Sequence, residues 1–308
     1  MSALVLMICA YAAIVIFVVV VAYRTVKIAK MPVHLRWELA PVPHEKGKSA
    51  YGGSYLEEYE WWTRERESSM LNEVVYMAKE IFLLKGVWEN NRGLWPFTFL
   101  FHNGIYLLAA AVALIFVSAV MLLFSSPLTP LDLALGLASI LLIAAYCIGV
   151  AGSFGLLVKR YVDPDLRPFN STSTYLNLAL LGLVFATGLY AYFSTADYSL
   201  ELGYFARSLI TFSPQSYISV PLGVHILIAL IFLTYLPFTY MIHFVAKYFT
   251  YHEVRWNDRP QSEQMTRKLN ELLQQPVSWS APHVKGDGKK NWVDTATEEM
   301  KDEKKSEN

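Results

Sequence analysis

The chain has 308 residues, of which 54% are hydrophobic and 14% are aromatic, and its mean hydropathy is +0.32. These values indicate an integral membrane protein. Its formal net charge of zero points to no particular partner, and we expect no nucleic acid to bind. The two cysteines, Cys9 and Cys147, form no CxxCH motif for covalent haem and no cysteine array for zinc or an iron–sulfur cluster. A bound metal would therefore need histidine or methionine ligands.

Five segments that carry no charge in their interiors are long enough to cross a bilayer, which takes roughly 20 helical residues. The first lacks the basic leader of a cleaved signal peptide, so we expect it to remain a membrane helix. The segments are 2–23, 97–124, 132–158, 174–196 and 219–247. The sequence therefore predicts an all-α integral membrane protein built as a bundle of five transmembrane helices.

Lysine and arginine are distributed very unevenly among the connecting segments. Twenty-five of them fall in 24–96, in 159–173 and in the tail from Lys247 onward, whereas the other two connections contain only Arg207. Connecting segments rich in lysine and arginine stay on the cytoplasmic side of a membrane. The distribution predicts a multi-pass protein of the cell membrane, with its N-terminus outside and its C-terminus in the cytoplasm.

The parts outside the spans are expected to have structure of their own. The predicted divisions are a first helix (1–23), a cytoplasmic loop (24–96), a four-helix membrane region (97–249) and a cytoplasmic tail (250–308). The apolar residues that predict an amphipathic helix on the cytoplasmic membrane surface are Leu71, Val74, Val75, Ala78, Ile81 and Phe82. We expect a second amphipathic helix at the outer surface in 197–218. In the tail, VSWSAPHVKGDGKKNWVD could dock to another subunit, and EEMKDEKKSEN is expected to be disordered.

Three of the seven histidines lie within the predicted spans. His225 and His243 are 18 residues apart, about five turns of a continuous helix, so both would face the same way roughly 27 Å apart. His102 and His243 lie at similar distances from the cytoplasmic ends of antiparallel helices, and therefore at equal depth. Two such imidazoles can bind one haem iron from opposite sides. The alternative for this pair is plain hydrogen bonding within the bundle.

His225 lies near the outer surface, and no histidine stands at the matching depth on the second span. Three interpretations remain open for it. Met121 or Met7 could join His225 as a ligand of a second haem iron. His225 could instead bond a quinone oxygen and exchange its proton at the outer face, with Tyr204 and Arg207 as further quinol contacts. Or His225 could be purely structural.

The remaining polar and small residues of interest have simpler interpretations. We expect four histidines to be solvated or interfacial: His34, His44, His252 and His283. Three glycines of the third span, Gly149, Gly152 and Gly155, predict close helix packing. No acidic residue and no pair of broken helices interrupts the spans, which argues against a transporter. A haem-free membrane anchor or small transporter subunit nevertheless remains the alternative to a cytochrome.

The chain resembles the membrane cytochrome b (gamma) subunit of respiratory nitrate reductase in LFHNGIYLL, GLLVKRYVDPDLRPFNSTSTY, HILIALIFLTYLPFTYMIHF and YFARSLITFSPQ. It is more closely similar to the cytochrome b subunits of the Dsr, Hme and Tmc transmembrane complexes of sulfate-reducing prokaryotes in PVHLRWELAPVPHE, KYFTYHEVRWND and VSWSAPHVKGDGKKNW. The resemblance implies five helices, haem b, menaquinol or menaquinone as substrate, and a cytoplasmic iron–sulfur partner related to heterodisulfide reductase. The expected role is electron transfer in a quinol oxidoreductase complex of sulfate respiration.

The resemblance also assigns residues to the haem sites. His102 and His243 correspond to the ligands of the haem on the cytoplasmic side, and His225 corresponds to one ligand of an outer haem. The nitrate-reductase pattern would place the second ligand of the outer haem where this chain has Val112. The outer turn SSPLTPL also lacks the lysine that could assist a quinol. The outer haem and the direction of electron flow therefore stay open.

Overall fold

The computed structural model describes residues 2–31, 43, 45, 47–48, 51, 53–54, 57–60, 69–124, 128–215, 217–251, 263–281, 284 and 286–298. It divides into two compact units, 1–256 and 257–308, which are described separately. The helices of the first unit are α1 (Ala3–Ala29), α2 (Met70–Phe82), α3 (Lys85–Asn90), α4 (Trp95–Leu123), α5 (Leu128–Val162), α6 (Thr172–Ser194), α7 (Tyr198–Thr211), α8 (Val220–Tyr235) and α9 (His243–Phe249). Its 3-10 turns are η3 (Arg167–Phe169), η4 (Leu236–Phe238) and η5 (Tyr240–Ile242).

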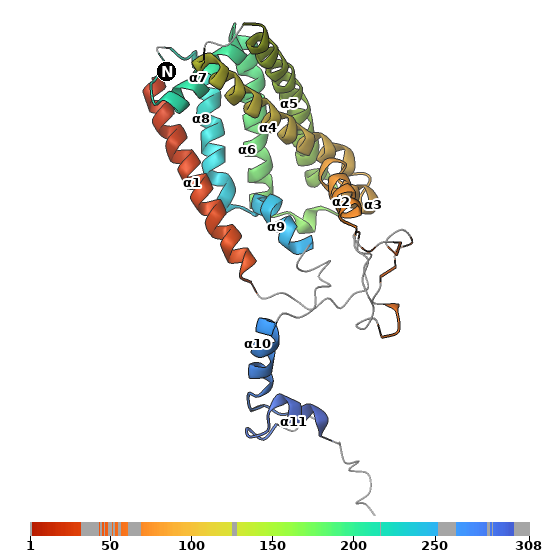
Figure 1. Cartoon of the computed structure of the whole chain (residues 1–308). Helices are drawn as coiled ribbons and strands as arrows, with labels where there is room; N and C mark the ends of the chain where they lie inside the picture. The colour runs from red at the N-terminus through yellow and green to blue at the C-terminus, as the bar shows by residue number, and fades with distance from the viewer. Residues whose placement is uncertain are drawn as a thin grey trace, which may run out of the picture. The chain divides into compact units, whose positions relative to one another are not determined.

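Five of these helices are long and apolar enough to cross a membrane, as predicted: α1, α4, α5, α6, and α8 together with η4. Helix α4 packs along α5, α5 against α6, α6 against α8, and α8 against α1. Helix α7 contacts α1, α4 and α5 at one end of the bundle, and α9 lies at the other end (Figure 1). We refer to these as the α7 end and the α9 end. Aliphatic and aromatic side chains such as Val19, Ile140 and Phe193 cover the outside of the bundle, as expected for contact with lipid.

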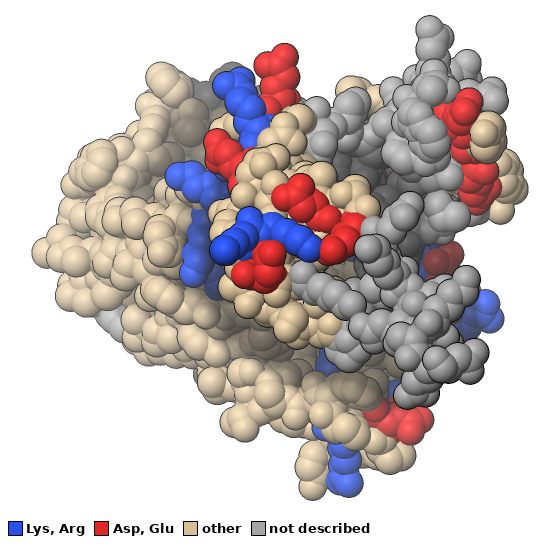
Figure 2. Space-filling model, turned by 90° about the horizontal axis from the view of Figure 1, so that it is seen from below, with Lys and Arg blue, Asp and Glu red and all other residues tan. Residues whose placement is uncertain are grey.

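Among the described residues, charged side chains lie near the ends of the long helices or in the segments beyond them. Lys27, Lys85, Lys159, Arg167 and Lys247 all lie toward the α9 end. Figure 2 views the molecule from below Figure 1 and shows lysines, arginines and acidic residues of the described part of the chain. The middle of each span therefore has no charged side chain, and the charges lie toward its ends.

The glycines of α5 allow α4 to approach closely, as predicted. A Cβ atom on Gly152 would collide with the backbone of Phe101, the residue before His102. One turn away, a Cβ atom on Gly104 would lie 2.9 Å from the Cα atom of Gly149. Since helices in a membrane associate by backbone-to-backbone packing at small residues, these contacts fix the position of His102 relative to α5.

We predict that Gly152→Ala lowers the free energy of unfolding by about 1–3 kcal/mol, because the added methyl group overpacks the α4–α5 contact. Gly136→Ala is the matched control, since Gly136 is also in α5 but has no atom within 4 Å of the added Cβ. This control should be neutral or stabilising by roughly 0.5–1 kcal/mol. Thermal unfolding in detergent measures both, and equal effects would contradict the close contact.

The predicted amphipathic helix forms as α2. Its apolar residues Leu71, Val74 and Phe82 are exposed, whereas Glu80 on the opposite face is buried. The exposed apolar face suits a membrane surface, and its placement on the cytoplasmic side stays a prediction.

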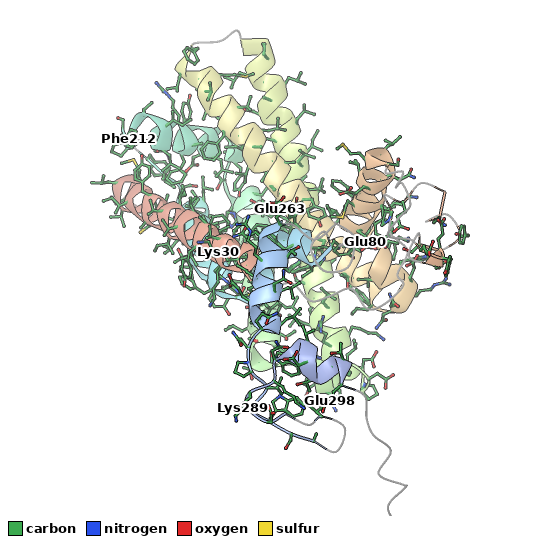
Figure 3. All side chains as sticks on the ribbon, turned by 60° about the horizontal axis from the view of Figure 1, so that its bottom comes forward. Lys30, Glu80, Phe212, Glu263, Lys289 and Glu298 are labelled. Carbon is green, nitrogen blue, oxygen red and sulfur yellow. The ribbon has the colours of Figure 1, made fainter. Side chains whose placement is uncertain are left out.

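The second unit contains α10 (Glu263–Leu273) and α11 (Trp292–Thr297), with an isolated antiparallel bridge between Pro276 and Asn291. Val277 is buried, and the Trp279 and Trp292 rings lie 6.0 Å apart. Figure 3 shows Lys289 and Glu298 near α11. The tryptophan-containing segment is thus folded, while its docking to another subunit stays a prediction. Of 298–308, expected to be disordered, Glu298 is described and binds Lys290 Nζ at 2.8 Å, while 299–308 lie outside the described residues.

Candidate functional site

The fifth predicted span is not one continuous helix. Helix α8 ends at Tyr235, and Thr239 between η4 and η5 has an extended backbone with ψ of 177°. Pro237 explains the break, because proline has no N–H to donate and its ring collides with the preceding turn. The prediction that His225 and His243 face the same way on one helix is therefore wrong. His243 instead begins the separate helix α9.

Arg24 of α1 stabilises the break. Its Nη1 atom donates to the carbonyl oxygens of Pro237 and Thr239, both at 2.8 Å. The Thr239 hydroxyl donates to the carbonyl of Leu236 at 2.8 Å and accepts from the backbone N–H of Met241 at 3.0 Å. Backbone groups released by the break thus find partners where water is scarce, as membrane proteins require. The segment that leads into His243 is held against α1.

His102 and His243 meet at the α9 end of the bundle. Their ring centroids are 6.2 Å apart and their planes are inclined at 74°. The Nδ1 atom of His102 lies 2.9 Å from the carbonyl oxygen of Thr98. Because a carbonyl only accepts, this nitrogen carries the proton and Nε2 keeps a free lone pair. The backbone at Tyr240 and Met241 hydrogen-bonds the His243 ring.

This geometry fits two imidazoles that share one metal ion. Two metal–nitrogen bonds of about 2 Å plus the ring radii put the centroids of such a pair roughly 6 Å apart. A ring N–H donated to a backbone carbonyl, as at His102, is typical of metal-ligating histidines. No group of three or more histidine, cysteine or acidic residues that could hold a metal occurs in the described residues. His102 and His243 would together supply the two nitrogen ligands of a bis-histidine haem iron.

Charged and polar side chains surround this pair. The buried carboxylate of Glu80 on α2 accepts from Lys247 Nζ at 3.4 Å and from the Tyr251 hydroxyl at 3.3 Å. Lys247 lies one helical turn beyond His243. Glu80 therefore joins α2 to the helix that carries His243.

Helix α4 also holds α2. Trp95 Nε1 donates to the carbonyl of Leu83 at 2.8 Å, and the Tyr106 hydroxyl donates to that of Ile81 at 3.0 Å. These side chains satisfy carbonyls at the C-terminal end of α2, which have no partner within the helix. Side chains of α4, the helix that carries His102, thus hold the C-terminal end of α2.

His225 is buried and lies in a different environment. Its Nε2 atom is 3.2 Å from the Tyr146 hydroxyl and its Nδ1 atom is 3.2 Å from the Thr187 hydroxyl. Thr187 donates its own proton to the carbonyl of Leu183 at 2.8 Å. Thr187 must then accept from His225 Nδ1, so His225 Nε2 accepts from Tyr146.

A cavity of about 300 Å³ adjoins His225. His225 and Tyr146 are its polar residues, and the rest of its lining consists of aliphatic and phenylalanine side chains from α1 and from α4 to α8. Val112 lies in the α4 wall. The cavity has the size and character of a site for an apolar small molecule with a polar group to orient it.

A second haem held by two protein ligands does not fit this cavity. Neither Met7 nor Met121 lines it, and Val112 offers no lone pair. Tyr204 and Arg207, predicted to contact a quinol with His225, lie on the exposed face of α7 and do not line the cavity either. The structure therefore brings His102 and His243 together, but not His225 with its expected partners. His34, His44, His252 and His283 lie outside the described residues.

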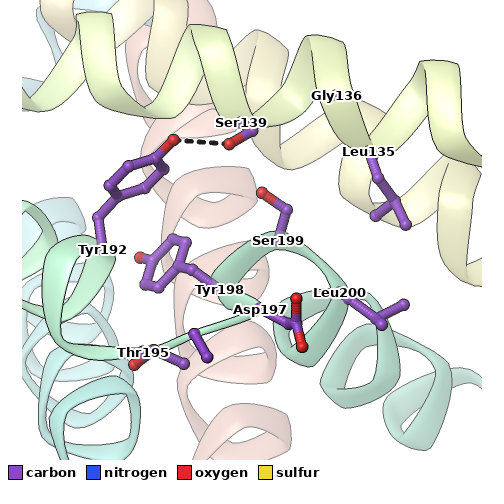
Figure 4. Close-up of a pocket in the computed structure, with 10 residues that line it drawn as sticks. Leu135, Gly136, Ser139, Tyr192, Thr195, Asp197, Tyr198, Ser199 and Leu200 are labelled. Carbon is purple, nitrogen blue, oxygen red and sulfur yellow. Dashed lines mark hydrogen bonds between the residues drawn. The ribbon is translucent and has the colours of Figure 1, made fainter.

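A second cavity, of about 320 Å³, lies at the α7 end. Ser139, Tyr192, Tyr198 and Ser199 line it, and the exposed Asp197 stands at its edge (Figure 4). Ser139 and Tyr192 share a hydrogen bond of 2.7 Å. Burial, with a smaller contribution from Tyr146, raises the pKa of Tyr198 well above its usual value, so its hydroxyl stays protonated.

Sequence reasoning missed Tyr146, Thr187 and Tyr198. Tyrosine and threonine are common in apolar helices, where threonine can bond its own backbone. No sequence pattern marks them, because their bonds to His225 and to each other join different helices of the packed bundle.

The model of the nitrate reductase gamma subunit family matches residues 88–257, more than half of the chain. The chain belongs to this family. None of the curated proteins compared with the chain matches it. The matched region contains His102, His225 and His243 and leaves out α1 and most of the second unit. Members of the nitrate reductase gamma family are membrane haem b subunits that transfer electrons in oxidoreductase complexes.

We predict that Arg24→Ala lowers the free energy of unfolding by about 2 kcal/mol, because two hydrogen bonds from a charged donor are lost at the break. Lys27→Ala, which removes an exposed cation from the same helix, should have little effect. Thermal unfolding in detergent separates the two. Equal behaviour of both variants would show that Arg24 does not stabilise the break.

Proposed function

We propose that the chain is the haem b subunit of a menaquinol-linked oxidoreductase of the cell membrane, passing electrons between membrane quinol and a cytoplasmic iron–sulfur subunit. The observation that carries this proposal is the His102–His243 pair, with ring centroids 6.2 Å apart, in a member of the nitrate reductase gamma family. A haem b bound between them would supply one-electron redox chemistry.

The residues around the pair hold the ligands in place. The Thr98 carbonyl fixes the tautomer of His102, so that Nε2 points its lone pair away from the helix backbone. Arg24 fixes the segment that carries His243. His102 thus lies in a continuous helix, and His243 directly follows a break that Arg24 holds by hydrogen bonds. Both restraints limit how far the distance between the two ligands can vary.

The cavity beside His225 supports the quinol site. Its apolar walls would receive the quinol ring, and His225 and Tyr146 would bond the quinol oxygen. Because Thr187 holds His225 Nδ1–H, Nε2 is the atom that accepts a proton from the quinol. The hydrogen bond of 3.2 Å from Tyr146 to Nε2 is at the long end of the normal range, so a quinol hydroxyl can replace it. In this proposal His225 is a quinol contact and not an iron ligand.

The α9 end is the proposed docking face for the partner. Its connecting segments carry nearly all lysines and arginines of the chain, which supports a cytoplasmic location. We propose an iron–sulfur subunit related to heterodisulfide reductase, as in the Dsr, Hme and Tmc complexes of sulfate respiration. Helix α2 would contribute to this face.

A haem-free membrane anchor is the alternative, and the haem content decides between them. We predict that the purified full-length chain contains one haem b per polypeptide and that His243→Ala abolishes it, because one axial ligand is lost. His225→Gln should keep the haem. Haem and protein assays measure the ratio, and retention of the haem in His243→Ala would contradict the His102–His243 pairing.

The quinol site gives a separate prediction. Val112→Phe should weaken binding of the naphthoquinone menadione at least tenfold, because the larger ring fills the cavity opposite His225. Val117→Phe, at an exposed position of α4 that does not line the cavity, is the matched control and should bind normally. Quinone binding to the full-length protein is measured by fluorescence quenching. Equal affinities for both variants would place the quinone elsewhere.

A further inference from the structure

A chain of hydrogen bonds connects the apolar cavity at His225 with the polar cavity at the α7 end. The Tyr146 hydroxyl lies 3.2 Å from His225 Nε2 and 2.7 Å from the Tyr198 hydroxyl. Tyr146 lines the apolar cavity and Tyr198 lines the polar one. Both tyrosines are buried, and their rings are 6.3 Å apart. The two phenol oxygens therefore bridge the wall between the cavities.

The protons along this chain have a defined order. Thr187 donates to the Leu183 carbonyl and so accepts from His225 Nδ1. His225 Nε2 then accepts from the Tyr146 hydroxyl, and the Tyr146 oxygen accepts from the Tyr198 hydroxyl. Every donor finds one acceptor. The Tyr146 and Tyr198 hydroxyls can rotate and so exchange their donor and acceptor roles. The bond from Thr187 to Leu183 cannot be reversed, because a carbonyl never donates.

We propose that Tyr146 and Tyr198 form the route by which protons leave the quinol site for the surface beside Asp197. This inference rests on the proposed function, in which a quinol is oxidised in the apolar cavity.

The transfer takes place in balanced steps. A quinol hydroxyl replaces Tyr146 at His225 Nε2, and the Tyr146 hydroxyl turns to donate to Tyr198, which turns toward the polar cavity. The quinol proton moves to Nε2, and once the quinol oxygen withdraws it passes from Nε2 to the Tyr146 oxygen. Tyr146 gives its own proton to Tyr198, and Tyr198 gives its proton to water in the polar cavity. One proton enters the relay for each that leaves. The quinol gives its two electrons, one at a time, to a one-electron acceptor of the haem class that is reoxidised between the steps. Its second proton follows the first through the relay, so no relay residue changes oxidation state.

The surroundings leave little choice of route within the described residues. Apart from His225 and Tyr146, the lining of the apolar cavity is made of aliphatic and phenylalanine side chains, which carry no proton. Thr187, the other neighbour of His225, donates a hydrogen bond to a backbone carbonyl, and the chain ends there because a carbonyl has no proton to pass on. The path through Tyr146 instead reaches Tyr198, which lines the polar cavity together with the exposed Asp197. Burial keeps Tyr198 protonated, so it relays by exchanging its proton.

The test is the rate at which menadiol, a naphthoquinol, reduces the haem of the intact complex in a stopped-flow experiment. We expect Tyr198→Phe to slow this rate at least tenfold, with unchanged haem content, menadione affinity and reduction by dithionite. Tyr11→Phe is the matched control, since it loses a phenol hydroxyl bonded to the Leu209 carbonyl of α7 at 2.7 Å but lies outside both cavities. A normal rate in Tyr198→Phe, or the same loss in Tyr11→Phe, would overturn the relay.

A second variant tests the route without touching the tyrosines. Gly136 lines the polar cavity and has open space around an added Cβ atom, so Gly136→Leu should fill the cavity and slow the menadiol reaction as well. If Tyr198→Phe fails to fold, this variant decides alone, and a normal rate would contradict the proposal. A wild-type complex that dithionite reduces but menadiol does not would refute the quinol site itself, and the relay with it. If the quinol site exists but the relay proposal is wrong, the wild-type complex reacts rapidly with menadiol, and Tyr198→Phe and Gly136→Leu react at the same rate.

Discussion

The hydrogen bonds from Arg24 to the Pro237 and Thr239 carbonyls are the interaction on which the proposed haem site depends. In a bilayer an unpaired carbonyl costs several kcal/mol, so a proline in an apolar span needs a donor from elsewhere. Arg24 supplies two bonds of 2.8 Å from a single nitrogen of another helix. With the break satisfied in this way, His243 begins a new helix whose ring faces His102.

The two ends of the bundle are built for different chemistry. At the α9 end, two imidazoles approach each other with their backbone partners fixed, and the charged pair of Glu80 and Lys247 connects this site to α2. At the α7 end, one histidine faces an apolar cavity, and hydroxyl groups lead from it to a polar one. The first arrangement suits an electron carrier, and the second suits a ligand that releases protons. With these two sites at opposite ends of the bundle, the electrons and the protons of the ligand would leave on opposite sides of the membrane.

The five spans follow directly from hydropathy, because backbone groups in lipid must be paired within helices. The sequence also predicts that His102 and His243 meet. The depth of each histidine can be counted from the end of its span without any knowledge of side-chain contacts. The break at Pro237 was not predicted, because a single proline in an apolar run is also compatible with a continuous, kinked helix. Only the structure shows that Arg24 hydrogen-bonds the carbonyls that the break leaves unpaired. The role of Tyr146 was missed for a similar reason, as a tyrosine in a span shows its hydrogen-bond partners only after the helices are packed.

Electron paramagnetic resonance of the oxidised full-length protein tests the central claim most directly. Two nitrogen ligands from His102 and His243 predict a single low-spin ferric haem, with the strongly anisotropic signal expected of imidazole planes inclined at a large angle, as the rings are here at 74°. The same sample should show one b-type band when reduced. A high-spin signal, or a well-folded protein without any haem signal, would contradict the account.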